Sequence, residues 1–96
     1  MIRSFRNQGT EDLFNGIDSK AARKVCAEAA VKAARRKLVA LEAATKLEEL
    51  RGKGYGLEKL ERDRAGQHAI RIDDQFRVCF IWTEGAAEQV EVTDYH

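Results

Sequence analysis

Three residues near the end of the chain are of types that move protons. Asp94, Tyr95 and His96 bring together a carboxylate, a phenol and an imidazole, directly after a strand-like run over residues 90–92. An unperturbed histidine titrates at about pH 6.5, so at neutral pH it can give or take a proton. The cluster therefore indicates general acid-base chemistry at the end of a strand. A short polar tail without function is the alternative, and the tail alone does not exclude it.

The composition is that of a single globular domain over residues 1–96. Hydrophobic residues make up 44% of the chain and charged residues 34%, which excludes an intrinsically disordered protein. No apolar run approaches the roughly 20 residues that cross a bilayer, and residues 1–5 lack the apolar core of a secretory signal. We therefore expect a cytoplasmic protein without membrane contact. Cys26 and Cys79 lack the spacing of metal ligands, which predicts buried free thiols rather than a disulfide.

Charge is unevenly distributed along the chain. The net charge is +1, but residues 1–53 carry an excess of Lys and Arg and residues 54–96 an excess of Asp and Glu. The densest basic cluster lies in a stretch expected to be helical and comprises Lys32, Arg35, Arg36 and Lys37. A solvated helix face is the first interpretation of this cluster, and contact with nucleic acid is the second.

The first half of the chain has the pattern of helices. Residues 2–5 suit a short strand, and Thr10 is predicted to cap a short helix that ends at Asn15-Gly16. Residues 19–47 contain no Gly and no Pro, and their apolar positions recur in steps of three and four, which predicts one long helix. The apolar positions on its inner face are Ala27, Val31, Ala34, Leu38 and Leu41.

The second half changes to a period of two, which is typical of strands. Residues 51–56 form a glycine-broken loop too irregular for a phosphate-binding motif. Strands are then predicted over 69–72, 76–82 and 89–93, with turns at Asp73-Asp74 and Glu84-Gly85. Such a meander buries one face under the helices of the first half, so the fold class is α+β.

Strand alternation predicts which side chains share the uncovered face of the sheet. If Phe76, Val78 and Phe80 face the helices, Arg77 faces away from them. By the same alternation Glu91, Thr93 and Tyr95 lie on the side of Arg77. His68 alternates with Ile70 and Ile72 and is expected to point to the covered face, so a packing or surface role is expected for it rather than catalysis.

The order of these elements and the wording of several segments resemble the RelE/ParE superfamily of toxins, and specifically the HigB branch of type II toxin-antitoxin systems. The resemblance runs nearly end to end, and it rests on the order and spacing of phrases that are each weak alone. These phrases are Met1-Ile2-Arg3-Ser4-Phe5, Leu41-Glu42-Ala43-Ala44-Thr45, Leu57-Glu58-Lys59-Leu60, Asp63-Arg64-Ala65-Gly66-Gln67-His68-Ala69-Ile70-Arg71-Ile72, Asp74-Gln75-Phe76-Arg77-Val78-Cys79-Phe80 and Asp94-Tyr95-His96.

The resemblance implies a RelE-like fold, with N-terminal helices packed on one face of a small antiparallel sheet. It also implies an enzyme that enters the A site of the 70S ribosome and cleaves messenger RNA there, and that a HigA-type helix-turn-helix antitoxin holds inactive. Operator DNA would be contacted only through that antitoxin. Catalytic roles carry over to Arg77, Asp94, Tyr95 and His96, with no metal and no cofactor. RNA or ribosome contacts are expected at Lys32, Arg35, Arg36, Lys59 and Arg71.

One departure from the family concerns the segment after the glycine-broken loop. Some HigB toxins carry basic residues there, whereas this chain has Glu58 and Glu61. In the YoeB-like branch a glutamate in this general region serves as base, so Glu58 is a candidate base. A slow enzyme is the alternative.

Metal-free cleavage of RNA requires a base for the 2′-hydroxyl proton, a cation for the phosphorane and an acid for the departing 5′-oxygen. Arg77 suits the second role, because a guanidinium stays charged and presents paired donors to phosphate oxygens. His96 is the first choice for acid or base, Asp94 could orient the imidazole, and Tyr95 could stack on a base or donate to the phosphate.

Two other functions remain open at this stage. A ParE-like protein poisons DNA gyrase without cleaving RNA, and it would need no proton-transferring tail. A module that only binds its antitoxin is the second alternative, and Glu58 and Glu61 would fit an activity that has decayed.

Overall fold

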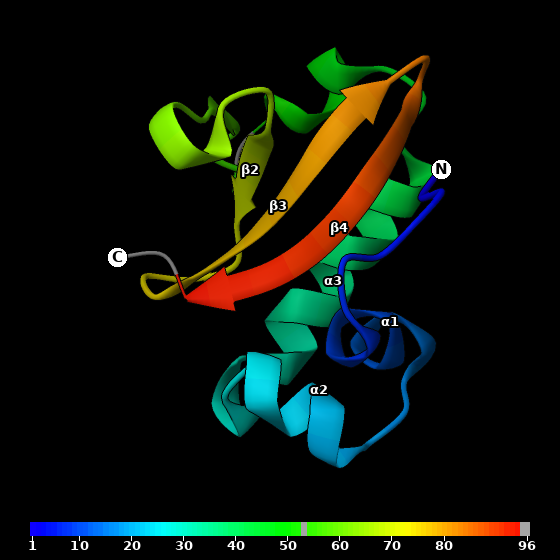
Figure 1. Ribbon diagram of the computed structural model, residues 1–96, viewed down its shortest axis with the longest axis vertical. Helices are drawn as coiled ribbons and strands as arrows, with labels where there is room; N and C mark the ends of the chain where they lie inside the picture. The colour runs from blue at the N-terminus through cyan, green and yellow to red at the C-terminus, as the bar shows by residue number, and fades with distance from the viewer. Residues whose placement is uncertain (53, 95–96) are drawn as a thin grey trace.

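Helices cover one face of a four-stranded antiparallel sheet in the computed structural model, which describes residues 1–52 and 54–94 (Figure 1). The strands lie in the sheet in chain order, from β1 to β4. The elements are α1 (Gln8–Asn15), α2 (Lys20–Val25), α3 (Val31–Ala43), β1 (Glu58–Lys59), β2 (His68–Arg71), β3 (Phe76–Thr83), β4 (Ala86–Asp94) and the 3₁₀ helices η1 (Glu28–Ala30), η2 (Leu47–Leu50) and η3 (Arg62–Arg64).

The N-cap of helix α1 lies three residues before the predicted one. Asn7 is the N-cap, and its side-chain oxygen accepts a hydrogen bond of 2.9 Å from the backbone N–H of Thr10. The prediction of Thr10 as cap is wrong because Thr10 lies inside the helix, fully buried, and its hydroxyl accepts a 3.0 Å bond from the Val92 N–H. The end at Gly16 is confirmed, with φ of +74° suited to glycine.

The single long helix predicted over residues 19–47 is wrong. Ser19 caps the short helix α2, the chain then becomes extended at Cys26 (φ −151°, ψ 131°), and α3 starts only at Val31. No Gly or Pro causes this break. Cys26 and Ala30 are buried there (3% and 4% exposed), so core packing outweighs the high helix propensity of the segment. In α3, Ala34, Leu38 and Leu41 are fully buried as predicted.

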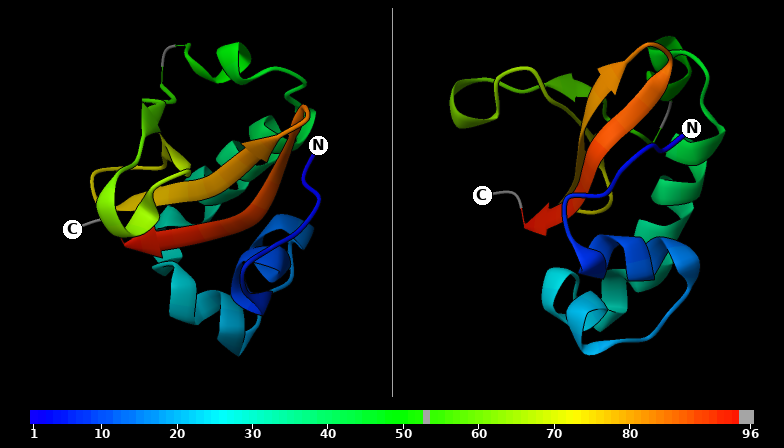
Figure 2. Two further views of the ribbon diagram at one scale, coloured as in Figure 1. Left: turned by 45° about the horizontal axis from the view of Figure 1, so that its top comes forward. Right: turned by 45° about the vertical axis from the view of Figure 1, so that its right-hand side comes forward.

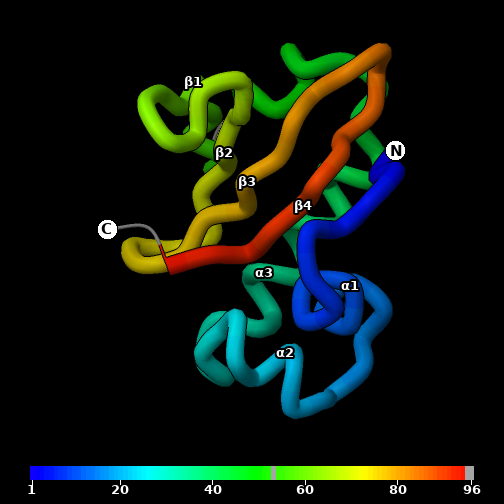
Figure 3. Tube along the Cα trace, in the orientation of Figure 1, coloured from blue at the N-terminus to red at the C-terminus, as the bar shows by residue number. Residues whose placement is uncertain are grey.

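The predicted meander is confirmed. Strand β3 pairs with both β2 and β4, and the β3–β4 turn at Glu84 and Gly85 has φ of +51° and +77°. A bulge in β4 accompanies a shift of register between Cys79 and Ile81. Residues 2–5, predicted as a strand, run parallel to β4 as an extended segment with only isolated bridges, at Ile2 to Ala87 and at Phe5 to Val90 (Figure 3).

The main core lies between α3 and the face of the sheet that carries Phe76, Val78 and Phe80. A second, smaller cluster lies on the other face and consists of Leu60, Ala69 and Cys79. The segment around η3 stands on this side of the sheet, away from α3 (Figure 2). The face predicted to be uncovered is therefore covered in part. Among residues 1–52 and 54–94, no helix is both long and apolar enough to cross a membrane.

Candidate functional site

The strand register places Arg77 on the face of the sheet away from α3, as alternation predicted. Arg77 pairs with Arg71 on β2 and with Thr93 on β4, so these three side chains form one row across the sheet. We call this the arginine row. The neighbouring row on the same face contains Glu58, Ala69, Cys79 and Glu91. The predicted grouping of Arg77 with Glu91 and Thr93 is confirmed, whereas Tyr95 and His96 lie outside the described residues.

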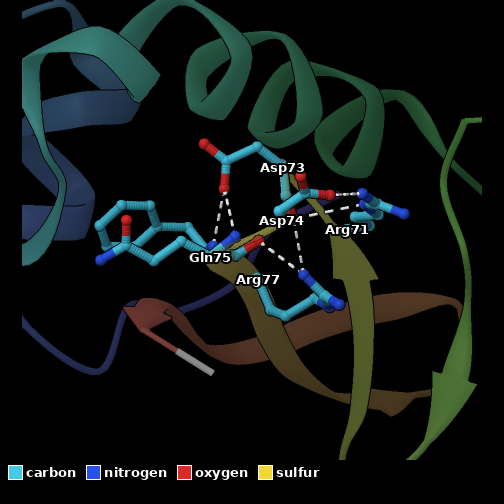
Figure 4. Close-up of polar contacts among 6 residues, drawn as sticks. Arg71, Asp73, Asp74, Gln75 and Arg77 are labelled. Atoms are coloured by element: carbon cyan, nitrogen blue, oxygen red, sulfur yellow. Dashed lines mark hydrogen bonds and ion pairs between the residues drawn. The ribbon is translucent and has the colours of Figure 1, made fainter. Parts of the chain in front are cut away.

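Both guanidinium groups of the arginine row are anchored at the turn between β2 and β3 (Figure 4). Nη1 of the half-buried Arg77 donates to the backbone oxygens of Asp73 (2.7 Å) and Phe76 (3.2 Å). Nε of Arg71 donates to the same Asp73 oxygen at 3.3 Å, and Arg71 also forms an ion pair with Asp74. Two cationic side chains are therefore held close together at one end of the sheet.

The turn itself is shaped by the side chain of Asp73. Its Oδ1 accepts hydrogen bonds from the backbone N–H groups of Gln75 (2.9 Å) and Phe76 (2.7 Å). These donors favour the charged carboxylate, so the pKa of Asp73 is lowered, first by Phe76 and then by Gln75. On the opposite side of the turn, the N–H groups of Ile72 and Asp73 donate to the Phe76 oxygen at 3.0 and 3.3 Å.

Asp94 joins the end of β4 to this turn. It pairs with Phe76 in the ladder, next to the Arg77–Thr93 pair, and its Oδ2 accepts a 2.9 Å hydrogen bond from Nε2 of Gln75. By alternation its side chain leaves the sheet on the side opposite to Arg77. The end of β4, from which the predicted catalytic tail continues, therefore lies within one residue of the arginine row.

Glu58 shares the face of Arg77 but not its strand neighbourhood. It is exposed on β1, two strands from β3, so sheet geometry separates its backbone from that of Arg77 by about 10 Å across the sheet and about 7 Å along it. Cys79 lies between them. Burial raises the pKa of the Cys79 thiol, and the charges of Arg64, Glu91, Glu58 and Arg77 also act on it. The charges of four ionised side chains therefore act at the position of Cys79 on this face.

An ion-pair network on the same face was not predicted from sequence. Glu91 accepts a 3.0 Å bond from Nη1 of Arg64, and Nε of Arg6 lies 3.8 Å from its other oxygen. Arg64 also donates to the side chain of Gln67 at 3.1 Å. The network ties the η3 segment to β4. Alternation placed Glu91 on the correct face, but no sequence pattern links it to a residue 27 positions away.

Four of the five predicted RNA or ribosome contacts lie on the opposite side of the sheet from Arg77. Lys59 pairs with His68, whose ring faces the main core. Lys32, Arg35 and Arg36 lie on α3 and line a surface groove with Tyr55. Nε of Arg35 donates to the Leu13 oxygen at 3.1 Å, which connects α3 to the last turn of α1. Only Arg71 is brought together with Arg77.

The packing role predicted for His68 is confirmed. Its ring stacks on Phe80 with centroids 6.1 Å apart, and burial, followed by the charges of Lys59 and Arg51, lowers its pKa. Both cysteines are buried and free, as predicted. Within the described part of the chain, no three His, Cys, Asp or Glu side chains are grouped so that they could hold a metal ion.

The sequence and the fold match known toxins. Residues 3–96 match the family model of the RelE-like toxin of type II toxin-antitoxin system HigB. Endoribonuclease HigB of Proteus vulgaris is 30% identical over 101 residues, an alignment that covers all of both chains. In the solved YoeB-YefM complex from Staphylococcus aureus, one chain superposes with a TM-score of 0.60 at 12% identity, over 100% of this chain and 98% of that one.

These matches confirm the resemblance read from the residues, and the structural similarity confirms the RelE-like α+β fold. The family match covers almost the whole chain, including the arginine row and the strand that leads into the tail. This chain therefore belongs to the HigB family of RelE-like toxins of type II toxin-antitoxin systems.

Proposed function

We propose that this toxin is an endoribonuclease that cleaves messenger RNA in the ribosomal A site and so inhibits translation. The observation that carries the proposal is the position of Arg77, whose guanidinium is anchored on the face of the sheet away from α3, one residue from the end of β4. The proton-transferring residues Asp94, Tyr95 and His96 continue from that end. The name of the Proteus relative, an endoribonuclease, supports the same reaction class.

The reaction we propose is an internal transesterification. The 2′-oxygen attacks the adjacent phosphorus while a base removes its proton, and the bond between phosphorus and the 5′-oxygen breaks as an acid protonates that oxygen. The products are a 2′,3′-cyclic phosphate and a 5′-hydroxyl end. Negative charge builds on the non-bridging oxygens in the transition state, and a fixed guanidinium stabilises that charge without reorganising.

Arg77 is the cation of this scheme, because its backbone anchors at 2.7 and 3.2 Å leave little freedom of position. His96 acts as acid or base, with Asp94 to orient the imidazole and Tyr95 to stack on a base or donate to the phosphate. Glu58 is the candidate base, on the same face as Arg77. Arg71 supplies a second positive charge toward the RNA backbone.

We propose that cleavage depends on the ribosome. Around Arg77 the two rows of this face hold only Arg, Thr, Glu, Ala and Cys side chains, so within residues 1–52 and 54–94 they offer RNA bases no ring for stacking. The ribosome would therefore have to present and orient the substrate. On the helical side, Lys32, Arg35 and Arg36 would contact ribosomal RNA phosphates, and Lys59 would add a further contact.

The partner that holds the toxin inactive is proposed to be a HigA-type helix-turn-helix antitoxin, through which alone the complex would reach operator DNA. The family is defined by its toxin-antitoxin pairs, and the YoeB neighbour was solved together with YefM. We place the toxin in the cytoplasm, where its substrate is found.

The proposal is tested with purified toxin, 70S ribosomes and a defined message, by mapping new 5′ ends. Cuts within ribosome-bound codons that are absent with Arg77→Ala are the expected result. Cleavage of naked RNA at the same toxin concentration would contradict ribosome dependence. DNA breaks that require gyrase, without cuts in RNA, would replace the proposal by a ParE-like poison, and neither activity would leave an antitoxin-binding module.

A further inference from the structure

We propose that Asp73 is a positioning residue for the cleavage reaction, because its side chain shapes the β2–β3 turn so that its backbone oxygen anchors the guanidinium groups of Arg77 and Arg71. The inference rests on the proposed function for its effect on rate. Its structural part, the anchoring of two arginines by one turn residue, can be tested separately.

The backbone N–H of Phe76 has an unusual acceptor. In a common β-turn this N–H, three residues after Asp73, would bond to the Asp73 backbone oxygen. Here Oδ1 of Asp73 accepts it instead, at 2.7 Å, and accepts the Gln75 N–H at 2.9 Å as well. The carboxylate thus replaces the backbone oxygen as the acceptor that closes the turn.

This replacement leaves the Asp73 backbone oxygen available to other donors. That oxygen accepts hydrogen bonds from Nη1 of Arg77 at 2.7 Å and from Nε of Arg71 at 3.3 Å. Two like charges repel, but the oxygen end of one carbonyl dipole attracts both guanidinium groups (Figure 4). The pair is therefore held in place before the reaction begins, so it can stabilise the charge that develops in the transition state without reorganising.

Removing the carboxylate should release this arrangement. Phe76 is buried (7% exposed), so its N–H requires an acceptor once Oδ1 is gone. The usual acceptor in a β-turn is the backbone oxygen of the first residue, here Asp73, so the Phe76 N–H would then compete with the two arginines for that oxygen. Alanine at position 73 should therefore displace Arg77 while the hairpin itself still closes.

The prediction separates the shape of the turn from the charge of the residue. Asparagine carries the same side-chain oxygen without the charge and should keep the turn, serine should keep it in part through its hydroxyl, and alanine should lose it. Asp74 is the matched control. It is the adjacent acid, its side chain is 96% exposed, and it forms an ion pair with Arg71.

The experiment measures kcat and KM for cleavage on programmed ribosomes, together with melting temperature, for Asp73→Asn, Asp73→Ser, Asp73→Ala and Asp74→Ala. We expect kcat of Asp73→Ala to fall between about 10-fold and 10²-fold with little change in KM, Asp73→Ser to be intermediate, and the other two to stay within about 3-fold of wild type. Equal activity of all four variants would overturn the proposal. So would an equal loss in Asp73→Asn and Asp73→Ala, because charge and not turn shape would then be responsible.

A second measurement does not depend on cleavage. The guanidinium protons of Arg71 and Arg77 should give protected, slowly exchanging NMR signals in wild type and Asp73→Asn, and should lose that protection in Asp73→Ala. If the wild type cuts no RNA, the proposed function is wrong. The NMR measurement still tests whether Asp73 holds the two arginines in place. Unprotected arginine signals in the wild type, or equal protection in Asp73→Ala, would overturn the positioning role even for an active enzyme.

Discussion

Arg77 lies directly opposite Thr93 in the β3–β4 ladder, next to the pair formed by Phe76 and Asp94. The register of a single hairpin therefore sets the distance between Arg77, the proposed phosphate-binding cation, and the segment that carries the proposed acid and base. A slip by one residue would turn Arg77 into the main core. The long β3–β4 pairing, which extends from this end to the turn at Glu84 and Gly85, opposes such a slip.

Replacing Arg77 by alanine should abolish cleavage and leave the fold intact. The guanidinium is half-buried and bonded to two backbone oxygens, but it packs in neither of the hydrophobic clusters. We expect a loss of on the order of 10²-fold or more in single-turnover rate. Arg23→Ala, an exposed arginine on α2 to which the proposal gives no role, is the control for loss of one positive charge. A variant that melted several degrees lower and still cut at the normal rate would make Arg77 structural.

Thr10→Val should destabilise the toxin. The Thr10 hydroxyl accepts the N–H of the buried Val92, and valine would leave that N–H without its acceptor, at a cost of about 1–3 kcal/mol. Urea unfolding measures the change. Thr10→Ser keeps the hydroxyl and should lose clearly less. If serine and valine lost the same amount, the methyl packing of Thr10 and not its hydrogen bond would account for its burial.

Stability should fall in mild acid because of His68. Burial lowers its pKa in the folded protein, so below about pH 6.5 the unfolded chain binds the proton first and the free energy of unfolding decreases until the folded pKa is passed. The carboxylates of Asp12, Glu49 and Asp73 have lowered pKa values, so their contribution is present above about pH 4 and is lost only below it.

His68→Phe keeps a ring against Phe80 and should flatten the decrease that begins below about pH 6.5. Melting temperatures of both proteins across this decrease measure the effect. Parallel pH curves for the two proteins would assign the acid sensitivity to another group.

Glu58→Gln should reduce kcat by on the order of 10²-fold if Glu58 is the general base, as we propose. Glu61→Gln is the matched control, because Glu61 is equally exposed, lies three residues further along and precedes η3. Equal rates for the two variants would leave the base role to the tail.

The double variant Lys32→Ala/Arg36→Ala should weaken ribosome binding and leave the cleavage rate of bound complexes unchanged, because both side chains lie on α3, across the sheet from Arg77. Each lost phosphate contact should reduce the slope of log affinity against log salt by about one. Lys20→Ala/Lys46→Ala removes the same charge from other exposed positions. The same loss of binding in both double variants would indicate a general charge effect.

Much of the sheet could be predicted from the sequence, because alternation at Phe76, Val78 and Phe80 leaves only one face to bury. The same alternation placed Arg77 correctly. The break at Cys26 could not be predicted, because no local signal opposes a helix there and Cys26 is buried by the main core of the folded chain.

The candidate site was predicted in part. The turn at Asp73-Asp74 was predicted correctly, but its hydrogen bonds to two arginines depend on which oxygen closes that turn. An aspartate followed two and three positions later by free backbone donors is a recognisable signal of this kind. Thr10 was assigned to a cap because threonine caps helices, whereas its true partner, Val92, is 82 residues away.

The N-terminal segment beside β4 affects the order in which the parts of the fold form. Backbone bonds of Arg3 and Arg6 to Ala87 and Val90, and the Thr10–Val92 bond, join residues separated by more than 80 positions. Contacts of such long range form late, after the entropy of closing almost the whole chain has been lost. Because β4 contributes Thr93 to the arginine row, that row is complete only once these long-range contacts have formed.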